Sequence, residues 1–211
     1  MAASPPTPKG IRRGGEQYEA IHAALAESAL LALAADGYDG VLHAAVAEAA
    51  GVSERTAFRH YPTKLELAVA GIEQLPTYDG WLDGPGSCAD RLRRGLAIGA
   101  QYPELIVPVI AACVAQRNAE PELLRTLRAH VLEPRTESIR RFVEMGLRSG
   151  ELRDGLTAEA MAALDLGFFL RSAAGMFPLG RGRARVERLF GEAWPLLAAP
   201  GHENDGTPFW Q

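Results

Sequence analysis

Two arginines four residues apart are the side chains of this sequence best suited to reading the edges of DNA bases. Arg55 and Arg59 lie in a short stretch at residues 54–61. In a helix, residues four apart share one face, which places Thr56 beside the arginines and His60 one step round. Arginine can donate two hydrogen bonds to guanine O6 and N7, and threonine can offer its hydroxyl or pack its methyl group on thymine. The spacing therefore predicts a face that binds double-stranded DNA.

The residues before this stretch are suited to presenting it. A short Ala-rich stretch at His43–Ala50 is followed by Gly51-Val52-Ser53. Gly51 can adopt the positive φ of a tight turn, and Ser53 can accept a hydrogen bond from the amides of the next helix. Small residues in the first stretch let two short helices cross closely. We therefore predict a helix, a turn and a second helix that exposes the arginines.

Two longer amphipathic stretches flank the pair. In the first, apolar side chains recur at steps of three and four and end at Asp36-Gly37; they are Tyr18, Ile21, Leu25, Ala29 and Leu33. The second stretch, Lys64–Leu75, repeats the pattern and ends before a proline. Lys64, at its start, is placed to bind a phosphate. Both stretches predict helices that pack with the short pair.

The stretch from Ala47 to Leu67, AEAAGVSERTAFRHYPTKLEL, resembles the signature of the TetR (tetracycline-repressor-like) family of transcriptional regulators. The resemblance spans Tyr18 to Leu75. Beyond it, only the helix pattern and the stretch Gly150–Arg153 are similar. The resemblance implies three DNA-binding helices, a helical domain that binds a small-molecule effector, and a homodimer joined by the last two helices of each subunit.

Carried over residue by residue, the resemblance implies that DNA is contacted by Glu54, Arg55, Thr56, Phe58, Arg59, His60 and Lys64. Two departures from the family pattern each remove a hydroxyl group. Val41-Leu42 stands where the family usually has threonine, which leaves His43 as the polar substitute, and Phe58 stands where tyrosine is frequent. We keep His43 among the predicted DNA contacts.

The rest of the chain also predicts helices, so the fold class is all-α. Glycines and prolines crowd residues 76–87, which indicates a loop and a domain boundary. Further helices are expected at about 87–100, 103–117, 121–149, 157–177 and 183–197, with a bend or a division at Pro134 and a C-cap at Gly150. The predicted domains are a flexible arm at 1–15, a DNA-binding domain at 16–75, a ligand-binding and dimerisation domain at 76–200, and a tail at 201–211.

The last two expected helices, 157–177 and 183–197, are the predicted dimer interface. Side chains that could line an effector pocket in the helical domain are Val109, Cys113, His130, Phe142, Met145, Phe168, Phe169 and Arg171. Ordinary core packing is the alternative for each of them. Their mixture of apolar and polar groups indicates an apolar or amphipathic ligand, whose identity the sequence does not give.

Other classes of function lack the residues that they need. The five histidines are scattered, and neither a nucleophile motif nor a glycine-rich phosphate loop is present. We therefore predict no catalytic residue, metal or cofactor. Two cysteines and the absence of a long uninterrupted apolar run favour a soluble protein of the cytoplasm rather than a membrane protein.

The charge balance leaves one alternative open. The net charge is −4, and acidic residues outnumber basic ones through residue 75. A helical small-molecule-binding protein with degenerate DNA binding would explain this balance and the missing threonine. Arg12 and Arg13 could reach a minor groove from the N-terminal arm, or the arm could simply be solvated.

Overall fold

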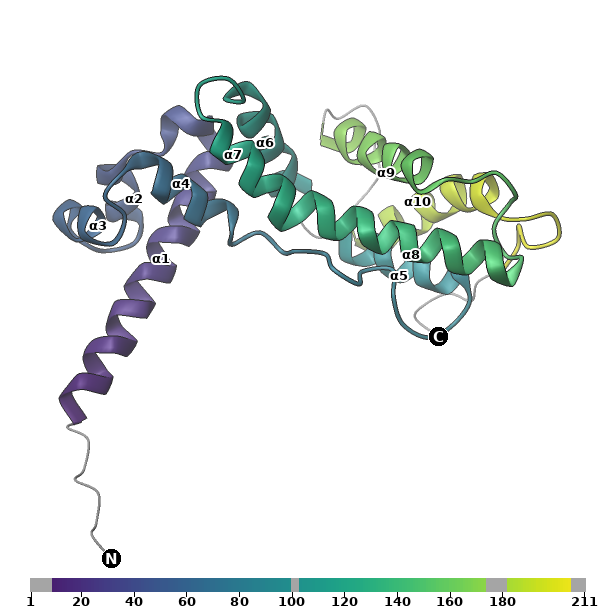
Figure 1. Cartoon of the computed structure of the whole chain (residues 1–211), viewed down its shortest axis with the longest axis horizontal. Coiled ribbons are helices and arrows are strands. Elements are labelled where there is room, and N and C mark those ends of the chain that lie inside the picture. The colour runs from purple at the N-terminus through teal and green to yellow at the C-terminus, as the bar shows by residue number, and fades with distance from the viewer. Residues whose placement is uncertain (1–8, 100–102, 174–181, 206–211) are drawn as a thin grey trace, which may run out of the picture. The chain divides into compact units, whose positions relative to one another are not determined.

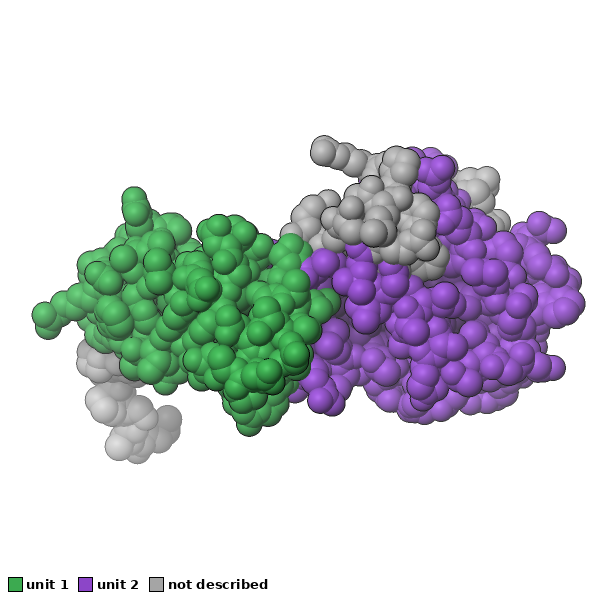
Figure 2. Space-filling model, turned by 90° about the horizontal axis from the view of Figure 1, so that it is seen from above, with its two compact units in different colours: residues 1–75, 108–126 green, residues 76–107, 127–211 purple. Residues whose placement is uncertain are grey.

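The computed structural model describes residues 9–99, 103–173 and 182–205 (Figure 1). Within these ranges the chain forms helices and no strand, and an isolated antiparallel bridge pairs Leu152 with Ala198. The all-α prediction is confirmed. The chain divides into two compact units, coloured separately in Figure 2. The first unit comprises residues 1–75 and 108–126, and the second comprises residues 76–107 and 127–211.

The first helix, α1, runs from Lys9 to Gly40. It begins directly after Pro8, within the arm predicted at 1–15. Its backbone leaves helical geometry at Gly37, where φ is 70°. The predicted end at Asp36-Gly37 is therefore a sharp kink, after which one more helical turn follows.

Three short helices complete the N-terminal part of the first unit: α2 at His43–Ala49, α3 at Glu54–His60 and α4 at Lys64–Ile72. The apolar face of α1 packs against α4, and Leu25, Ala29 and Leu33 are completely buried. The crossing is close at Gly71, where an added Cβ would lie 2.8 Å from the backbone nitrogen of Leu30. Glycine is required there by space, not by backbone conformation.

One helix in the described part of the chain is long and apolar enough to cross a membrane, judged by length and composition alone. It is the part of α1 between Gly15 and Gly40. From the sequence we expected no apolar stretch long enough to cross a membrane. Between Ala20 and Ala35, however, only Glu27 carries a full charge. Length and composition are weak evidence, because the core helix of a helical domain passes the same test.

Residues 108–126 pack with the first unit, although they fall within the predicted domain 76–200. They belong to two helices, α6 at Pro103–Ala115 and α7 at Pro121–Leu127, and to the turn between them. In that turn Glu120 accepts a hydrogen bond of 3.4 Å from the hydroxyl of Tyr38. The functional boundaries predicted from the sequence stay predictions, since compactness alone does not assign a role to a segment.

The second unit contains α5 at Cys88–Gly99, α8 at Glu133–Ser149, α9 at Ala158–Ala173 and α10 at Gly182–Leu197. Helix α5 packs against α10, and α8 packs against α9. The largest fully buried side chains of this unit include Trp194, Phe142 and Leu82. The predicted end of the α9 region at Phe177 lies outside the described residues.

The helix expected at 121–149 is divided near Pro134 by a short π-helix at Arg128–Leu132, which joins α7 to α8. Proline has no N–H to donate to the carbonyl of His130, and its ring crowds that carbonyl. The wider turn of a π-helix relieves both problems. Gly150 caps α8 in the left-handed conformation, with φ 77°, as predicted.

Candidate nucleic-acid interface

The turn between α2 and α3 has the predicted geometry. Gly51 adopts φ 70°, and the amide of Val52 donates to the carbonyl of Ala47 at 2.9 Å. Ser53 caps α3, because its hydroxyl accepts the amide hydrogen of Thr56 at 3.2 Å. These bonds satisfy backbone groups that a short helix leaves free at its ends. The turn therefore fixes the direction in which α3 leaves α2.

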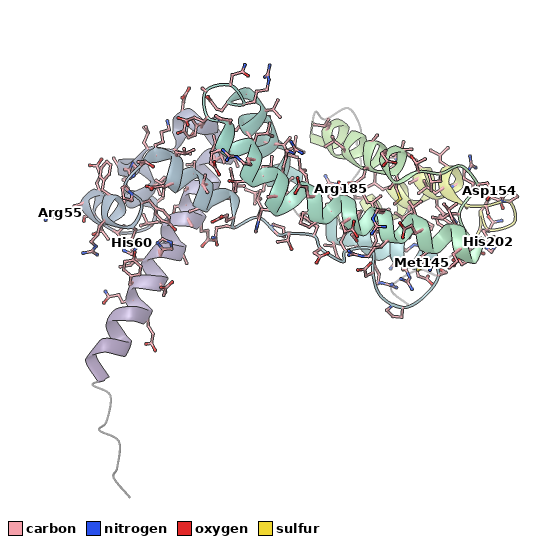
Figure 3. All side chains as sticks on the ribbon, in the orientation of Figure 1. Arg55, His60, Met145, Asp154, Arg185 and His202 are labelled. Atoms are coloured by element: carbon pink, nitrogen blue, oxygen red, sulfur yellow. The ribbon has the colours of Figure 1, made fainter. Side chains whose placement is uncertain are left out.

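Helix α3 buries one face and exposes the other. Ala57 is completely buried, whereas Arg55 and Arg59 are exposed, as predicted. Arg55 projects outward from α3 in Figure 3. Glu54 is also exposed, and Phe58 keeps 46% of its surface accessible. The exposed face thus carries two arginines, a carboxylate and an aromatic ring that another molecule could contact.

His43, which the sequence predicted as a DNA contact in place of threonine, is buried at the start of α2. It is only 8% exposed, and its Nε2 forms a 2.7 Å hydrogen bond with the carbonyl oxygen of Tyr61. Its ring stacks on Phe58, with centroids 3.9 Å apart and planes within 9°. This hydrogen bond to the carbonyl of Tyr61 occupies Nε2 of His43, so that atom is not available to bind a phosphate. His43 therefore holds α3 in place from the α2 side.

His60 is also turned inward, which corrects its predicted place among the DNA contacts. It follows Arg59 directly, and one residue step rotates a side chain by about 100° around a helix. That rotation brings its ring against α1, where it stacks on Tyr18 at 4.2 Å and is only 7% exposed. Its Nδ1 lies 3.4 Å from Nδ1 of His22.

Lys64 lies at the start of α4 and already has contacts within the first unit. Its Nζ donates to the carbonyl of Asp39 at 3.3 Å and sits 4.5 Å from the ring centre of Tyr38. Burial and the neighbouring Glu120 carboxylate raise the pKa of Tyr38 to about 12, so its ring stays neutral. The ammonium group is thus held near the N-terminal end of α4, where it is half-buried.

Four further residues position the interface and were not among the site residues predicted from the sequence. Thr63 and Glu66 form a capping box: the threonine hydroxyl accepts the Glu66 amide, and the Glu66 carboxylate accepts the Thr63 amide. The pattern Thr-x-x-Glu is a sequence signal for such a box. Tyr18 and His22 also support α3, and their spacing of four on the predicted first helix was the available signal.

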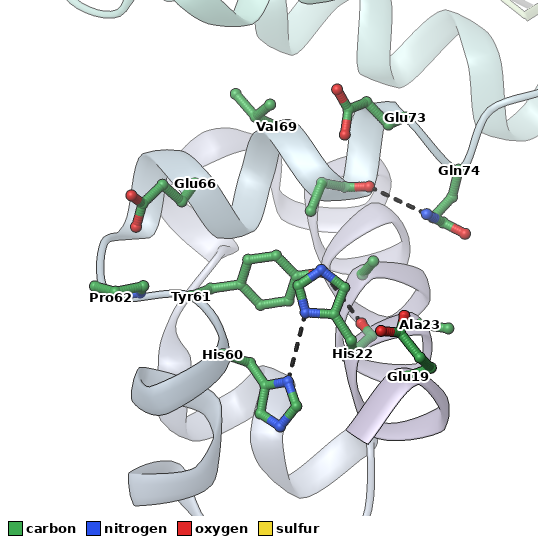
Figure 4. Close-up of a pocket in the computed structure, with 12 residues that line it drawn as sticks. Glu19, His22, Ala23, His60, Tyr61, Pro62, Glu66, Val69, Glu73 and Gln74 are labelled. Carbon is green, nitrogen blue, oxygen red and sulfur yellow. Dashed lines mark hydrogen bonds between the residues drawn. The ribbon is translucent and has the colours of Figure 1, made fainter. Parts of the chain in front are cut away.

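A hollow of about 490 Å³ lies between α1, the end of α3 and α4 (Figure 4). We call it the α1–α4 hollow. Its polar lining includes Glu19, His22, His60, Glu66 and Glu73. Burial and nearby carboxylates raise the pKa of Tyr61, which also lines it, to about 12. The hollow is therefore acidic at its rim and holds the two imidazoles on its inner side.

The predicted effector residues are distributed over both units. Val109 and Cys113 are buried in the first unit, and burial raises the pKa of Cys113 to about 11. Phe142 is buried in the second unit, where His130 and Met145 are half-buried; Met145 is labelled in Figure 3. Among the described side chains, these five line neither the α1–α4 hollow nor a second hollow near Trp81. The side chains of Phe168, Phe169 and Arg171 lie outside the described residues.

The second hollow is small, about 30 Å³, and belongs to the second unit. Its lining is almost entirely apolar, with Asp165 as the charged member. Arg135, which is only 9% exposed, binds Asp165 through two hydrogen bonds of 2.6 and 2.8 Å and lies 4.0 Å from the ring centre of Trp81. A buried pair of this geometry satisfies both charges inside the helical unit.

A metal site is not formed by the residues that the structure describes, since they contain no group of three or more His, Cys, Asp or Glu side chains placed to hold an ion. The chemistry of the interface is therefore that of exposed arginine donors on a capped helix.

A comparison with protein families matches the N-terminal part of the chain. Residues 25–70 match the family model described as bacterial regulatory proteins, tetR family. No curated protein matches the chain. Over these residues the chain carries the N-terminal domain of the tetR family, as the sequence resemblance predicted.

Solved structures share the fold over most of the chain. A TetR transcriptional regulator from Chloroflexus aurantiacus is similar with a TM-score of 0.66 and 21% identity, covering 89% of this chain and 99% of that one. A TetR family regulator from Marinobacter aquaeolei has a TM-score of 0.60 and 19% identity, covering 88% and 99%. The regulator FadR from Bacillus subtilis, solved in complex with stearoyl-CoA, has a TM-score of 0.52 and 14% identity, covering 82% and 90%. At these identities the likeness shows the fold alone.

Proposed function

We propose that this protein is a repressor that binds a palindromic DNA operator as a homodimer and is released by a small-molecule effector. The observation that carries the proposal is the exposed face of α3, where Arg55 and Arg59 project from a helix whose opposite face is buried and whose start is capped by Ser53. A short helix presented in this way fits the major groove.

In the proposed complex, α3 of each subunit enters a major groove. Arg55 and Arg59 read base edges, Thr56 and Phe58 contact thymine methyl groups or the backbone, and Lys64 binds a phosphate. Glu54 can accept a hydrogen bond from cytosine. Two such helices in a dimer must lie about 34–36 Å apart, or a multiple of that, to reach half-sites on one side of the duplex.

The dimer is proposed to form through α9 and α10. Helix α9 exposes Leu164, Leu166 and Leu170, and α10 exposes 53% of Leu196. Leu166 and Leu170 lie on neighbouring turns of one face of α9, and exposed apolar side chains placed in this way are typical of a surface that another chain covers. This agrees with the predicted interface at 157–177 and 183–197.

The effector is proposed to bind in the predicted helical domain at 76–200 and to be apolar or amphipathic. The fatty acyl ligand of the similar regulator FadR is one example of that chemistry in this fold. A ligand releases DNA only to the extent that it binds the non-DNA-binding conformation more tightly. The predicted pocket residues stay candidates, with His130 and Met145 the half-buried ones among them.

The alternative is a small-molecule-binding protein that has lost DNA binding. The inward placement of His43 and His60 favours it, as does Leu42, which is 54% exposed at the N-cap of α2 and has no polar atom to offer a phosphate. Under either proposal the role is non-enzymatic, and the compartment is the cytoplasm.

A mobility shift assay separates the two proposals. The probe is the promoter region beside the gene for this protein, with a scrambled duplex of equal length as the control. A repressor shifts the promoter fragment at protein concentrations that leave the scrambled duplex free. Equal shifts of both, or a shift of neither, contradict specific operator binding and support the alternative.

A further inference from the structure

A pair of histidine rings joins the end of α3 to α1. Nδ1 of His60 faces Nδ1 of His22 at 3.4 Å (Figure 4). Tyr18 stacks on His60, and Tyr61 stacks on His22 with ring centroids 4.3 Å apart. The hydroxyl of Tyr61 also donates to the backbone carbonyl of His22 at 3.2 Å. We call His22 and His60 the histidine pair. The pair fixes His60, the last residue of α3. Because α3 is proposed to enter the major groove, we call it the recognition helix.

The hydrogens of the neutral pair can be assigned from their surroundings. Two neutral imidazoles bond through Nδ1 atoms only if one of these atoms carries a hydrogen and the other does not. In the described part of the chain, Nε2 of His60 is buried with no hydrogen-bond partner. A buried N–H without an acceptor is less tolerable than a bare lone pair. The hydrogen of His60 is therefore assigned to Nδ1, which donates to His22.

A proton added to His60 or to His22 places a hydrogen on the buried Nε2 of His60. Protonation of His60 does so directly. Protonation of His22 turns its Nδ1 into a donor, so the hydrogen of His60 must move from Nδ1 to Nε2 if the two rings are to remain bonded. Both routes leave a desolvated N–H donor with no acceptor, which is costly. Acid therefore opposes the contact between α3 and α1.

The charged groups around the pair come from every helix packed against it. Arg59 on α3 opposes a further positive charge on His60, whereas Glu19 on α1 favours one. The pKa of His60 is lowered mainly by burial and further by the neighbouring His22 and Arg59. Glu19 acts in the opposite direction but does not offset these effects. The remaining carboxylates of the α1–α4 hollow belong to α4 and are Glu66 and Glu73. A proton on His22 would force a hydrogen onto the buried Nε2 of His60, as described above.

We propose that the histidine pair positions the recognition helix for DNA and that protonation of the pair weakens DNA binding. The proposal rests on the DNA binding proposed above. It assigns His60 a role opposite to a phosphate contact, because a protonated imidazole that touched phosphate would strengthen binding in acid. The sign of the pH dependence therefore separates a positioning role from direct contact.

The pair also links the stability of the first unit to pH. Unfolded His60 has the ordinary pKa of 6.5, and the folded value is lower. Between the two values the unfolded chain binds more protons than the folded one. The contribution of His60 is therefore fully present above pH 6.5 and is lost as the pH falls below that value.

The test is fluorescence anisotropy with the full-length protein. Its probe is a duplex selected from a random library at pH 8, long enough for two half-sites. Between about pH 8 and about pH 5.5, we expect the Kd of the wild type to rise about tenfold at constant salt. His60→Phe keeps a ring against Tyr18 but cannot titrate, so its Kd should change far less. His22→Phe provides a second variant, and His202→Gln in the second unit is the control that keeps the wild-type slope.

Two results would overturn the proposal. One is an affinity of the wild type that stays constant or rises in acid. The other is a pH dependence of Kd that is the same in His60→Phe and His22→Phe as in the wild type. If the wild type binds no duplex at pH 8, the proposed function fails, and the pair is tested by NMR titration of the histidine C2 protons in the full-length protein. A His60 resonance that titrates with an ordinary pKa then overturns the positioning role.

Discussion

At the scale of single residues, exposure divides α3 into side chains that can reach DNA and side chains that hold the helix. Arg59 is exposed and His60, the next residue, is 7% exposed. His43 and His60 clamp the end of α3 from two directions, through Tyr61 and through His22. The arginines therefore project from a helix whose orientation is fixed by buried rings, which lowers the cost of ordering it on DNA.

Arg59→Ala should lower the affinity for the selected duplex by about 1–3 kcal/mol, because a base-reading arginine makes two hydrogen bonds that a wrong base cannot accept. Affinity for random DNA should change much less. Lys64→Ala should weaken both duplexes similarly, since phosphate contacts carry no sequence information. Anisotropy titrations at fixed salt measure both effects.

The matched control is Arg148→Ala, which removes an exposed arginine from α8 in the second unit. It should leave both affinities unchanged. An equal loss on selected and random duplexes for Arg59→Ala would contradict the base-reading assignment and leave a phosphate contact in its place.

At the scale of elements, local rules predicted the helix-turn-helix, and tertiary contacts decided which way its ends face. Gly51 and Ser53 are recognisable because positive φ and helix capping each favour a few residue types. The burial of His60 depends on Tyr18, which is distant in sequence, so no local pattern contained it. The division of the helix near Pro134 was predictable because proline removes a backbone donor, but the π-helix that divides it was not.

Gly71→Ala should destabilise the first unit by about 1–3 kcal/mol, because the new Cβ would lie 2.8 Å from the backbone of α1 at Leu30 and neither helix can yield easily. Gly15→Ala is the control: it lies on the exposed side of α1 with nothing within 4 Å of the added Cβ. That change should stabilise the helix by up to about 1 kcal/mol.

Urea unfolding followed by circular dichroism measures both variants, provided that the slope of the transition is unchanged. Equal midpoints for the two variants would show that α1 and α4 do not cross as closely as the structure indicates.

At the scale of the whole molecule, the sequence predicted the all-α fold and the N-terminal helices, whereas the residues of the effector site stay a prediction. Buried apolar side chains such as Val109 and Phe142 serve a core or a pocket equally well, so their residue types could not distinguish the two. The packing of residues 108–126 with the first unit was also beyond local pattern, because it depends on contacts such as Tyr38 with Glu120.

The exposed leucines of α9 give the assembly a direct test. Leu166 and Leu170 are four residues apart and so share one face, with 42% and 45% of their surfaces accessible. Leu170→Glu should place a charge in the proposed interface and shift the protein from dimer to monomer, because an unpaired charge is costly to bury. Affinity for the selected duplex should then fall strongly, since a monomer contacts a single half-site.

Sedimentation velocity gives the mass, and anisotropy gives the affinity of the same samples. Leu147→Glu on α8 is the matched control, a leucine of 38% exposure outside the proposed interface. It should remain dimeric and bind DNA as the wild type does. If Leu170→Glu keeps the dimer mass while Leu147→Glu loses it, the interface lies on α8, and the spacing of the two recognition helices must then be set by a different pair of helices from the one proposed.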